Sequence, residues 1–164
     1  MQARMRQMSL FAVVAVALVV VLSGTALAQS SNSEVGTWKL NVAKSKIGPA
    51  GPKSATVRIE AAGAGTKTIV DGVDAADATV RHWEFSANYD GRDNSVVGNS
   101  PQGDMVARTR INATTTKTVN KKGGKITVTQ TAVISSDGKT RTITATGTDA
   151  LGHTVNHVTV WDKQ

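Results

Sequence analysis

The sequence contains no cysteine, so no disulfide bond stabilises the fold and nothing in the chain depends on an oxidising compartment. No stretch after residue 34 shows a 3.6-residue apolar repeat over helical length, which argues against a helical lid. The long apolar run covers only residues 10–22, whereas a helix needs about 20 apolar residues to cross a bilayer. The missing helical repeat favours β-structure after residue 34. The shortness of the apolar run favours an export signal over a membrane anchor.

The first 28 residues have the pattern of a secretory signal peptide. Arg4 and Arg6 precede the apolar run, and the small residues Ala26 and Ala28 occupy the −3 and −1 positions that signal peptidase recognises. We therefore expect cleavage after Ala28 and export to the periplasm or the medium. Residues 29–164 have the length of one domain, which we expect to be soluble and without a membrane span.

The predicted mature chain is moderately basic. Without Arg4 and Arg6 it keeps 17 of the 19 Lys and Arg residues against 12 Asp and Glu, a formal charge of +5. The charge is scattered, and its densest cluster, residues 121–125, contains a Gly-Gly pair typical of a solvated hairpin tip. With no recognition helix in the pattern, nucleic acid is not an expected partner.

Apolar and polar residues alternate with a period of two from Val35 onward, in segments rich in threonine and valine. Pairs such as Asp90-Gly91 and Gly123-Gly124 separate the segments, because glycine and aspartate tolerate the positive φ of tight hairpin turns. The pattern predicts about ten strands, near residues 35–42, 54–62, 66–73, 79–89, 94–99, 104–112, 115–121, 125–135, 139–148 and 153–162.

Ten short antiparallel strands in one domain either close into a barrel or stack as two sheets, because an open sheet of that size leaves exposed edges. The order of hairpins favours a single antiparallel up-and-down β-barrel of about eight to ten strands, since a Greek-key sandwich needs a long return connection. Residues 44–53, with Gly48-Pro49 and Gly51-Pro52, predict a loop after the first strand in place of a helix lid.

Both ends of the predicted barrel resemble the calycins. Residues 36–40, Gly-Thr-Trp-Lys-Leu, resemble the first strand of lipocalins, fatty-acid-binding proteins and avidins, and residues 158–163 resemble the last strand of fatty-acid-binding proteins. The chain is also similar to a group of small secreted bacterial proteins of unknown function that share this opening and the Lys-Ser-Lys sequence at residues 44–46. The resemblance implies a lipocalin-like barrel that binds a small apolar or amphipathic molecule inside it.

Two positions bear on how far the resemblance extends to the ligand. Fatty-acid-binding proteins place an arginine two residues before the last aromatic to bind a carboxylate, and this chain has Thr159 there. The resemblance therefore does not imply a fatty-acid grip of that type. In lipocalins a basic residue of the last strand packs over the first-strand tryptophan, and Lys163 is the candidate for that contact with Trp38.

Eight residues are candidates for the wall of an internal binding site: Trp38, Trp83, Phe85, Tyr89, Ile126, Val128, Gln130 and Trp161. Trp83, Phe85 and Tyr89 share one face of a strand, where they form either ordinary core or the apolar wall of a pocket. Trp38 and Trp161 either plug one end of the barrel or line it.

Polar residues on the predicted strands divide between the two faces. Gln130 interrupts the apolar face that contains Ile126 and Val128, so its amide either orients a ligand or bonds to a neighbouring strand or a trapped water. Arg108 and Arg110 have the opposite parity from the apolar residues Met105, Ala107 and Ile111 around them, which predicts that both arginines face solvent.

No catalytic or metal-binding constellation is evident. His153 and His157 are four residues apart, which on a strand separates them by roughly 13 Å. The spacing of Asp71, Asp74 and Asp77 does not fit a calcium loop, and no nucleophile elbow or phosphate loop occurs. We expect neither an enzyme nor a cofactor or metal site. The alternative to a ligand carrier is a filled barrel whose outer surface binds a protein or an envelope polymer.

Overall fold

The computed structural model describes residues 32–49, 51–75 and 78–164, and the predicted signal peptide lies outside them. Within these ranges the secondary structure consists of β-strands, with no helix. The eleven strands are β1 (Gly36–Lys46), β2 (Pro52–Ala62), β3 (Gly65–Asp74), β4 (Val80–Asn88), β5 (Asp90–Ser95), β6 (Val97–Gly98), β7 (Met105–Arg110), β8 (Thr115–Lys122), β9 (Lys125–Ile134), β10 (Thr140–Thr148) and β11 (Thr154–Lys163).

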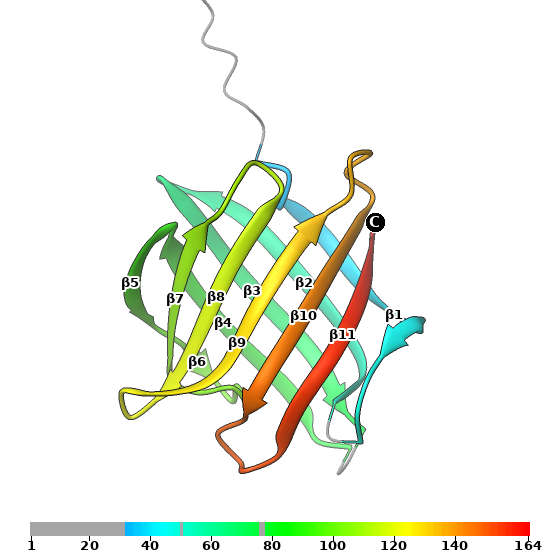
Figure 1. The fold of residues 1–164 in the computed structure, drawn as a ribbon, viewed down its shortest axis with the longest axis vertical. Coiled ribbons are helices and arrows are strands. Elements are labelled where there is room, and N and C mark those ends of the chain that lie inside the picture. The colour runs from blue at the N-terminus through cyan, green and yellow to red at the C-terminus, as the bar shows by residue number, and fades with distance from the viewer. Residues whose placement is uncertain (1–31, 50, 76–77) are drawn as a thin grey trace, which may run out of the picture. The chain divides into compact units, whose positions relative to one another are not determined.

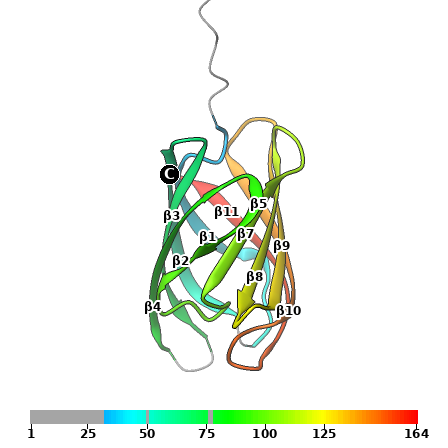
Figure 2. The same cartoon turned by 90° about the vertical axis from the view of Figure 1, so that its left-hand side faces the viewer.

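The strands form one antiparallel sheet that curls into a nearly closed barrel. The order of hydrogen-bonded neighbours is β5-β7-β8-β9-β10-β11-β1-β2-β3-β4-β6, so β7 to β11 form one side and β1 to β4 the other (Figure 1). The two end strands, β5 and β6, are separated in the chain only by Val96. A single segment therefore pairs first with β7 and then with β4. Figure 2 shows β5 and β7 facing the viewer, with β3 and β4 to their left and β8 to β10 to their right.

This architecture confirms the predicted all-β, up-and-down barrel. Nine of the ten predicted strands correspond to single observed strands, because each is set by its own alternation and turn residues. The strand expected at residues 94–99 differs. Its place is taken by β5, which starts earlier, and the two-residue β6. The backbone N–H of Val96 donates to the carbonyl of Asp104 at 2.9 Å, where the segment passes from one partner strand to the other.

The Lys-Ser-Lys sequence forms an irregularity in β1. The register between β1 and β11 shifts between Asn41 and Lys46. Within the shift, the Ser45 hydroxyl donates to the carbonyl of Asn41 at 2.6 Å and accepts from the backbone N–H of Val160 at 2.8 Å. The side chain thus supplies hydrogen bonds that the backbone ladder loses, as expected for a β-bulge. Beyond it, residues 47–49 and Gly51 form a loop and no helix. The loop is shorter than the predicted 44–53, because β1 continues through the bulge to Lys46 and β2 begins at Pro52.

The strongest hydrophobic packing gathers around Trp38, which is completely buried. The buried members of this core are Trp38, Leu40, Val57, Ile59, Val70, Ala132, Ile134, Ile143 and Trp161. The Trp38 indole N–H donates to the carbonyl of Glu34 at 2.8 Å, and the Lys163 Nζ lies 5.0 Å from the centroid of the Trp38 ring. The contact expected between a last-strand basic residue and the first-strand tryptophan is therefore present, as a cation–π contact.

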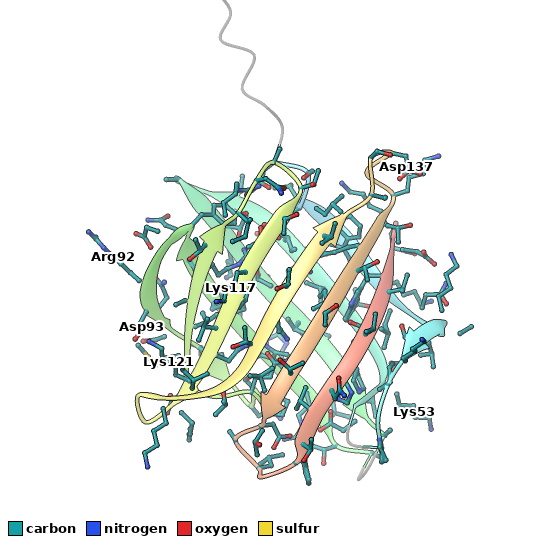
Figure 3. The ribbon with its side chains drawn as sticks, in the orientation of Figure 1. Lys53, Arg92, Asp93, Lys117, Lys121 and Asp137 are labelled. Atoms are coloured by element: carbon teal, nitrogen blue, oxygen red, sulfur yellow. The ribbon has the colours of Figure 1, made fainter. Side chains whose placement is uncertain are left out.

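The outer face of the barrel carries charged side chains. Lys53 and Arg92 extend away from the strands in Figure 3. Lys121 on β8 pairs with Asp93 on β5 at 2.7 Å, near the seam of the barrel. Because the side chains of a strand alternate between its two faces, the residues next to these outward-facing ones point into the barrel.

Candidate functional site

A cavity of about 160 Å³ lies inside the barrel. Its apolar wall includes the aromatic side chains of Trp83 and Phe85 on β4 and of Trp161 on β11. The two residues of β4 reach the interior because they occupy alternate positions on one face of the strand, as the sequence pattern predicts. The Trp161 indole N–H is already paired, since it donates to the Thr159 hydroxyl at 2.9 Å. The cavity thus has an aromatic wall built from strands on both sides of the barrel.

Four of the eight predicted binding residues line this cavity: Trp83, Phe85, Gln130 and Trp161. The Gln130 side chain makes no hydrogen bond to any described residue. Directly opposite it in the sheet lie Thr118 on β8 and Ala145 on β10, whose side chains also line the cavity. Gln130 therefore does not bond to a neighbouring strand, which leaves a ligand or a trapped water as its predicted partner.

The other four predicted residues lie elsewhere. Trp38 belongs to the packed core, and Val128 is completely buried in a second apolar cluster with Ala145 and Val155. Ile126 is 66% exposed at the start of β9, beside the Gly123-Gly124 hairpin. Tyr89 follows β4 and belongs to a polar network that the sequence pattern did not reveal.

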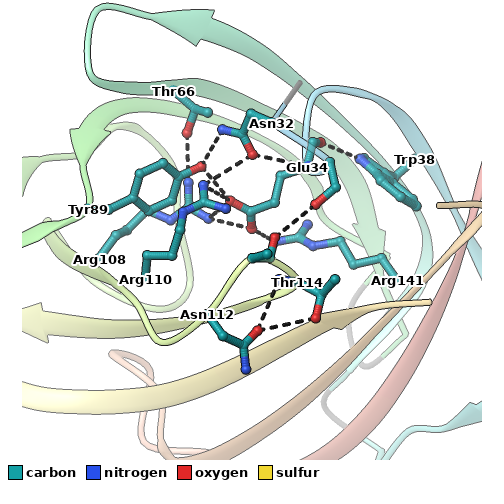
Figure 4. A network of polar contacts seen from close by, with 12 residues as sticks. Asn32, Glu34, Trp38, Thr66, Tyr89, Arg108, Arg110, Asn112, Thr114 and Arg141 are labelled. Carbon is teal, nitrogen blue, oxygen red and sulfur yellow. Dashed lines mark hydrogen bonds and ion pairs between the residues drawn. The ribbon is translucent and has the colours of Figure 1, made fainter. Parts of the chain in front are cut away.

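That network centres on the carboxylate of Glu34, which precedes β1 and is 2% exposed (Figure 4). Arg108 on β7 donates from one guanidinium nitrogen to both Glu34 oxygens, at 2.8 and 3.0 Å, and from another to the Thr66 hydroxyl at 2.7 Å. The Tyr89 hydroxyl donates to Glu34 Oε2 at 2.5 Å. These contacts join β3, β7 and the residue between β4 and β5 to the segment that leads into β1.

The prediction that Arg108 and Arg110 face solvent is wrong. Arg108 is 2% exposed, and the side chain of Arg110 is only 28% exposed. The parity of β7 is the reverse of that expected, because Val106 is completely buried beside the arginines while Ile111 is 58% exposed. Burial of these charges is possible because Glu34 provides a counter-charge that lies 74 residues away in the sequence.

Arg110 completes the outer part of the network. Its guanidinium carbon lies 3.8 Å from the centroid of the Tyr89 ring, and one of its guanidinium nitrogens lies 3.6 Å from Glu34 Oε2. Arg110 also donates to the side-chain oxygen of Asn32 at 3.1 Å, and the Asn32 amide donates to the Tyr89 hydroxyl at 2.8 Å. Tyr89 is therefore held by polar contacts and a cation–π contact, not by the wall of the cavity.

Competing effects set the pKa of Glu34. Burial alone raises the pKa of this carboxyl, but the charges of Arg108 and Arg141, the hydrogen bond from Tyr89 and the charge of Arg110 together lower it below its ordinary value. Glu34 is therefore ionised at neutral pH, and three arginines face one carboxylate. This part of the interior carries an excess of positive charge.

Arg141 on β10 is the third of these arginines and lines the cavity. Burial lowers its pKa to about 10, against the opposing attraction of Glu34, so its guanidinium stays charged at neutral pH. Its nearest counter-charge, Glu34 Oε1, lies 3.7 Å away, and its buried Nε has no hydrogen-bond partner among the described residues. Arg141 is thus a buried cation whose hydrogen-bonding capacity is only partly used.

The loop between β1 and β2 lies beside the cavity. His157 on β11 lines the cavity and accepts a hydrogen bond at Nδ1 from the backbone N–H of Gly48, at 3.1 Å. This arrangement requires an unprotonated Nδ1. Gly51, which also lines the cavity, has its backbone N–H bonded to the Gly48 carbonyl at 3.0 Å. The glycine-proline loop is therefore fixed to the barrel through a histidine.

Within the part of the chain that the structure describes, no group of three or more metal-ligating side chains gathers. The two histidines considered from sequence have separate partners, since His153 pairs with Asp149 at 3.1 Å while His157 bonds to Gly48. Among the described residues, no helix has the length and apolar character needed to span a bilayer.

Comparisons with protein-family models, with curated proteins and with solved structures gave no match to this chain. The nearly closed, all-antiparallel barrel fits a calycin-like fold in general.

The alternation along the strands predicts the aromatic wall of the cavity but not the charged residues of the interior. Arg141 sits in a strand where Ile143 and Ala145 share its parity, and all three are buried. Applying the same alternation to charged residues points to Arg141 as an inward residue. Glu34 has no comparable signal, because it precedes the first strand and belongs to no alternating segment.

Proposed function

We propose that this protein is an exported, lipocalin-like barrel that binds one small apolar or amphipathic molecule in its interior cavity. The observation that carries the proposal is the cavity of about 160 Å³, with three aromatic side chains on its wall and an unpaired amide, Gln130, among its polar groups. Such a site has the composition of small-molecule pockets, which are mostly apolar with a few polar groups that orient the ligand.

The size of the cavity limits the ligand. Drug-sized ligands occupy pockets of roughly 300–1,000 Å³, whereas a cavity of roughly 150 Å³ accommodates a molecule the size of benzene. The volume of about 160 Å³ therefore favours a compact molecule over a long acyl chain.

The lipocalin-like identity and the compartment rest on different observations. The contact between Lys163 and Trp38 is the one that the lipocalin pattern predicts, which supports the likeness beyond the general barrel. Export rests on the signal-peptide pattern of residues 1–28, which favours a binding activity in the periplasm or outside the cell.

The test is native mass spectrometry of the protein purified from the envelope fraction of its own host, followed by denaturation and identification of any released compound. We expect a discrete adduct that disappears on denaturation and corresponds to a compact molecule. An unmodified mass, together with no binding of benzene-sized probes, would support the alternative of a filled barrel whose outer surface binds a protein or an envelope polymer.

A further inference from the structure

We infer that the ligand of this cavity is a small carboxylic acid whose carboxylate binds Arg141. The inference rests on the proposed function, since it assigns the chemical class of the molecule in the same cavity. It is carried by a buried guanidinium that lines the cavity and makes no hydrogen bond to any described residue, and whose nearest carboxylate oxygen lies 3.7 Å away. The Arg141 side chain is 9% exposed, so its guanidinium is largely removed from bulk water.

Glu34 does not satisfy Arg141, because its oxygens are already occupied. Oε1 accepts from Arg108 at 2.8 Å, and Oε2 accepts from Arg108 at 3.0 Å and from Tyr89 at 2.5 Å. The distance of 3.7 Å from Arg141 to Oε1 is a charge contact and too long for a hydrogen bond. A second carboxylate at Arg141 would complete its pairing.

The other carboxylates that line the cavity are already engaged. Asp74 pairs with Arg81 at 2.7 Å. Asp149 accepts backbone N–H groups of Leu151 and His153, at 2.9 and 2.8 Å, and pairs with the His153 ring. The positive charge at Arg141 is therefore available to a ligand, and an anionic group is the complementary chemistry.

The neighbours of Arg141 define the rest of the ligand. Trp161 lies directly opposite Arg141 across the β10–β11 ladder, and both side chains line the cavity. Because directly opposed side chains are neighbours on one face of a sheet, an acid whose carboxylate binds Arg141 would hold its apolar part near the Trp161 indole. Gln130 on β9 also lines the cavity, but it lies opposite Ala145, four positions along β10 from Arg141, and so belongs to another part of the wall. A compact aromatic or short branched acid matches this set.

The test compares three probes of one size on the intact exported protein: benzoate, benzamide and benzyl alcohol. Binding is measured by isothermal titration calorimetry and by tryptophan fluorescence at neutral pH. We expect benzoate to bind at least about tenfold more tightly than either neutral probe, because a hydrogen bond to a charged group is the stronger kind. The ¹⁵N–¹H signal of the Arg141 Nε should shift on addition of benzoate.

Variants assign the effect to one side chain. Arg141→Met should weaken benzoate binding about tenfold or more and leave benzyl alcohol binding within about twofold, while Arg141→Lys should keep part of the preference for the acid. The matched control is Arg58→Met, because Arg58 is exposed on the outer face of β2 and pairs with Glu60. Circular dichroism checks that each variant folds.

The outcomes separate the two proposals. Equal binding of benzoate and benzyl alcohol would overturn the assignment of an acid and leave the proposed function intact. Failure of all three probes to bind would overturn both. If Arg141→Met does not fold, the role of Arg141 is tested on the unmodified protein by the comparison of the probes and by the Arg141 Nε signal. An unmoved signal in the presence of bound benzoate would refute that role.

Discussion

Replacement of Glu34 by glutamine should severely destabilise the barrel. Glu34→Gln preserves the size of the side chain and removes the one negative charge that faces three arginines. Arg108 and Arg141, whose side chains are 2% and 9% exposed, would then remain buried without a counter-charge. A neutral amide still accepts hydrogen bonds, but it does not offset the cost of holding two guanidinium groups away from water.

The size of the effect follows from this burial. Removing one partner of a buried ion pair costs about 3–5 kcal/mol, whereas the free energy of unfolding of a typical domain is about 5–15 kcal/mol. The matched control is Glu60→Gln, which removes a carboxylate paired with Arg58 at 3.0 Å on the outer face, with about half of each side chain exposed. A surface pair of this kind contributes about 0–1 kcal/mol.

The free energy of unfolding of both variants is measured by urea unfolding, followed by circular dichroism and tryptophan fluorescence. We expect a much lower midpoint for Glu34→Gln at an unchanged m-value, and little change for Glu60→Gln. The double variant Glu34→Gln with Arg108→Met should lose less stability than the two single changes combined, because it removes charges from both sides of the pair. A loss below about 1 kcal/mol for Glu34→Gln would refute the structural role given to this carboxylate.

Three further predictions follow from the interior. The pKa of Glu34 is lower in the folded protein than in the unfolded chain, so the unfolded chain binds more protons in acid. The stabilisation by ionised Glu34 is therefore fully present above the ordinary glutamate pKa of 4.5 and is lost as pH falls through the folded-state pKa. The slope of stability against pH should be shallower in Glu34→Gln, and an unchanged slope would contradict the lowered pKa. Trp83→Ala should weaken binding of benzene-sized probes while the β-sheet circular dichroism is retained, and unchanged binding would contradict the aromatic wall. His157→Ala removes the acceptor of the Gly48 N–H and should increase hydrogen exchange at that amide by about fivefold or more, whereas an unchanged rate would show that the loop is held by other contacts.

Much of the fold was predictable because its signals are local. Each strand carries its own alternation and ends at turn residues, so the barrel and the inward face of Trp83 and Phe85 could be derived from the sequence. The sequence did not predict that residues 94–99 are divided between β5 and β6, because the division depends on a change of partner strand from β7 to β4.

The charged interior was hidden for a similar reason. Arg108 was expected outside because a charged residue normally faces water, and only the distant Glu34 makes its burial possible. Val128 and Trp38 have the inward parity expected of binding residues, but packing against other apolar side chains removes them from the cavity. Periodicity thus identifies which face a residue occupies, whereas the position of the cavity depends on how the strands pack together.

The most direct test of ligand binding is a crystal structure of the protein purified from its own host without refolding. We expect continuous density for a compact molecule against Trp83 and Trp161, with an acidic group at Arg141. A cavity that contains only ordered water molecules bonded to Arg141 and Gln130 would contradict the carrier function and identify the interior as a hydrated structural core.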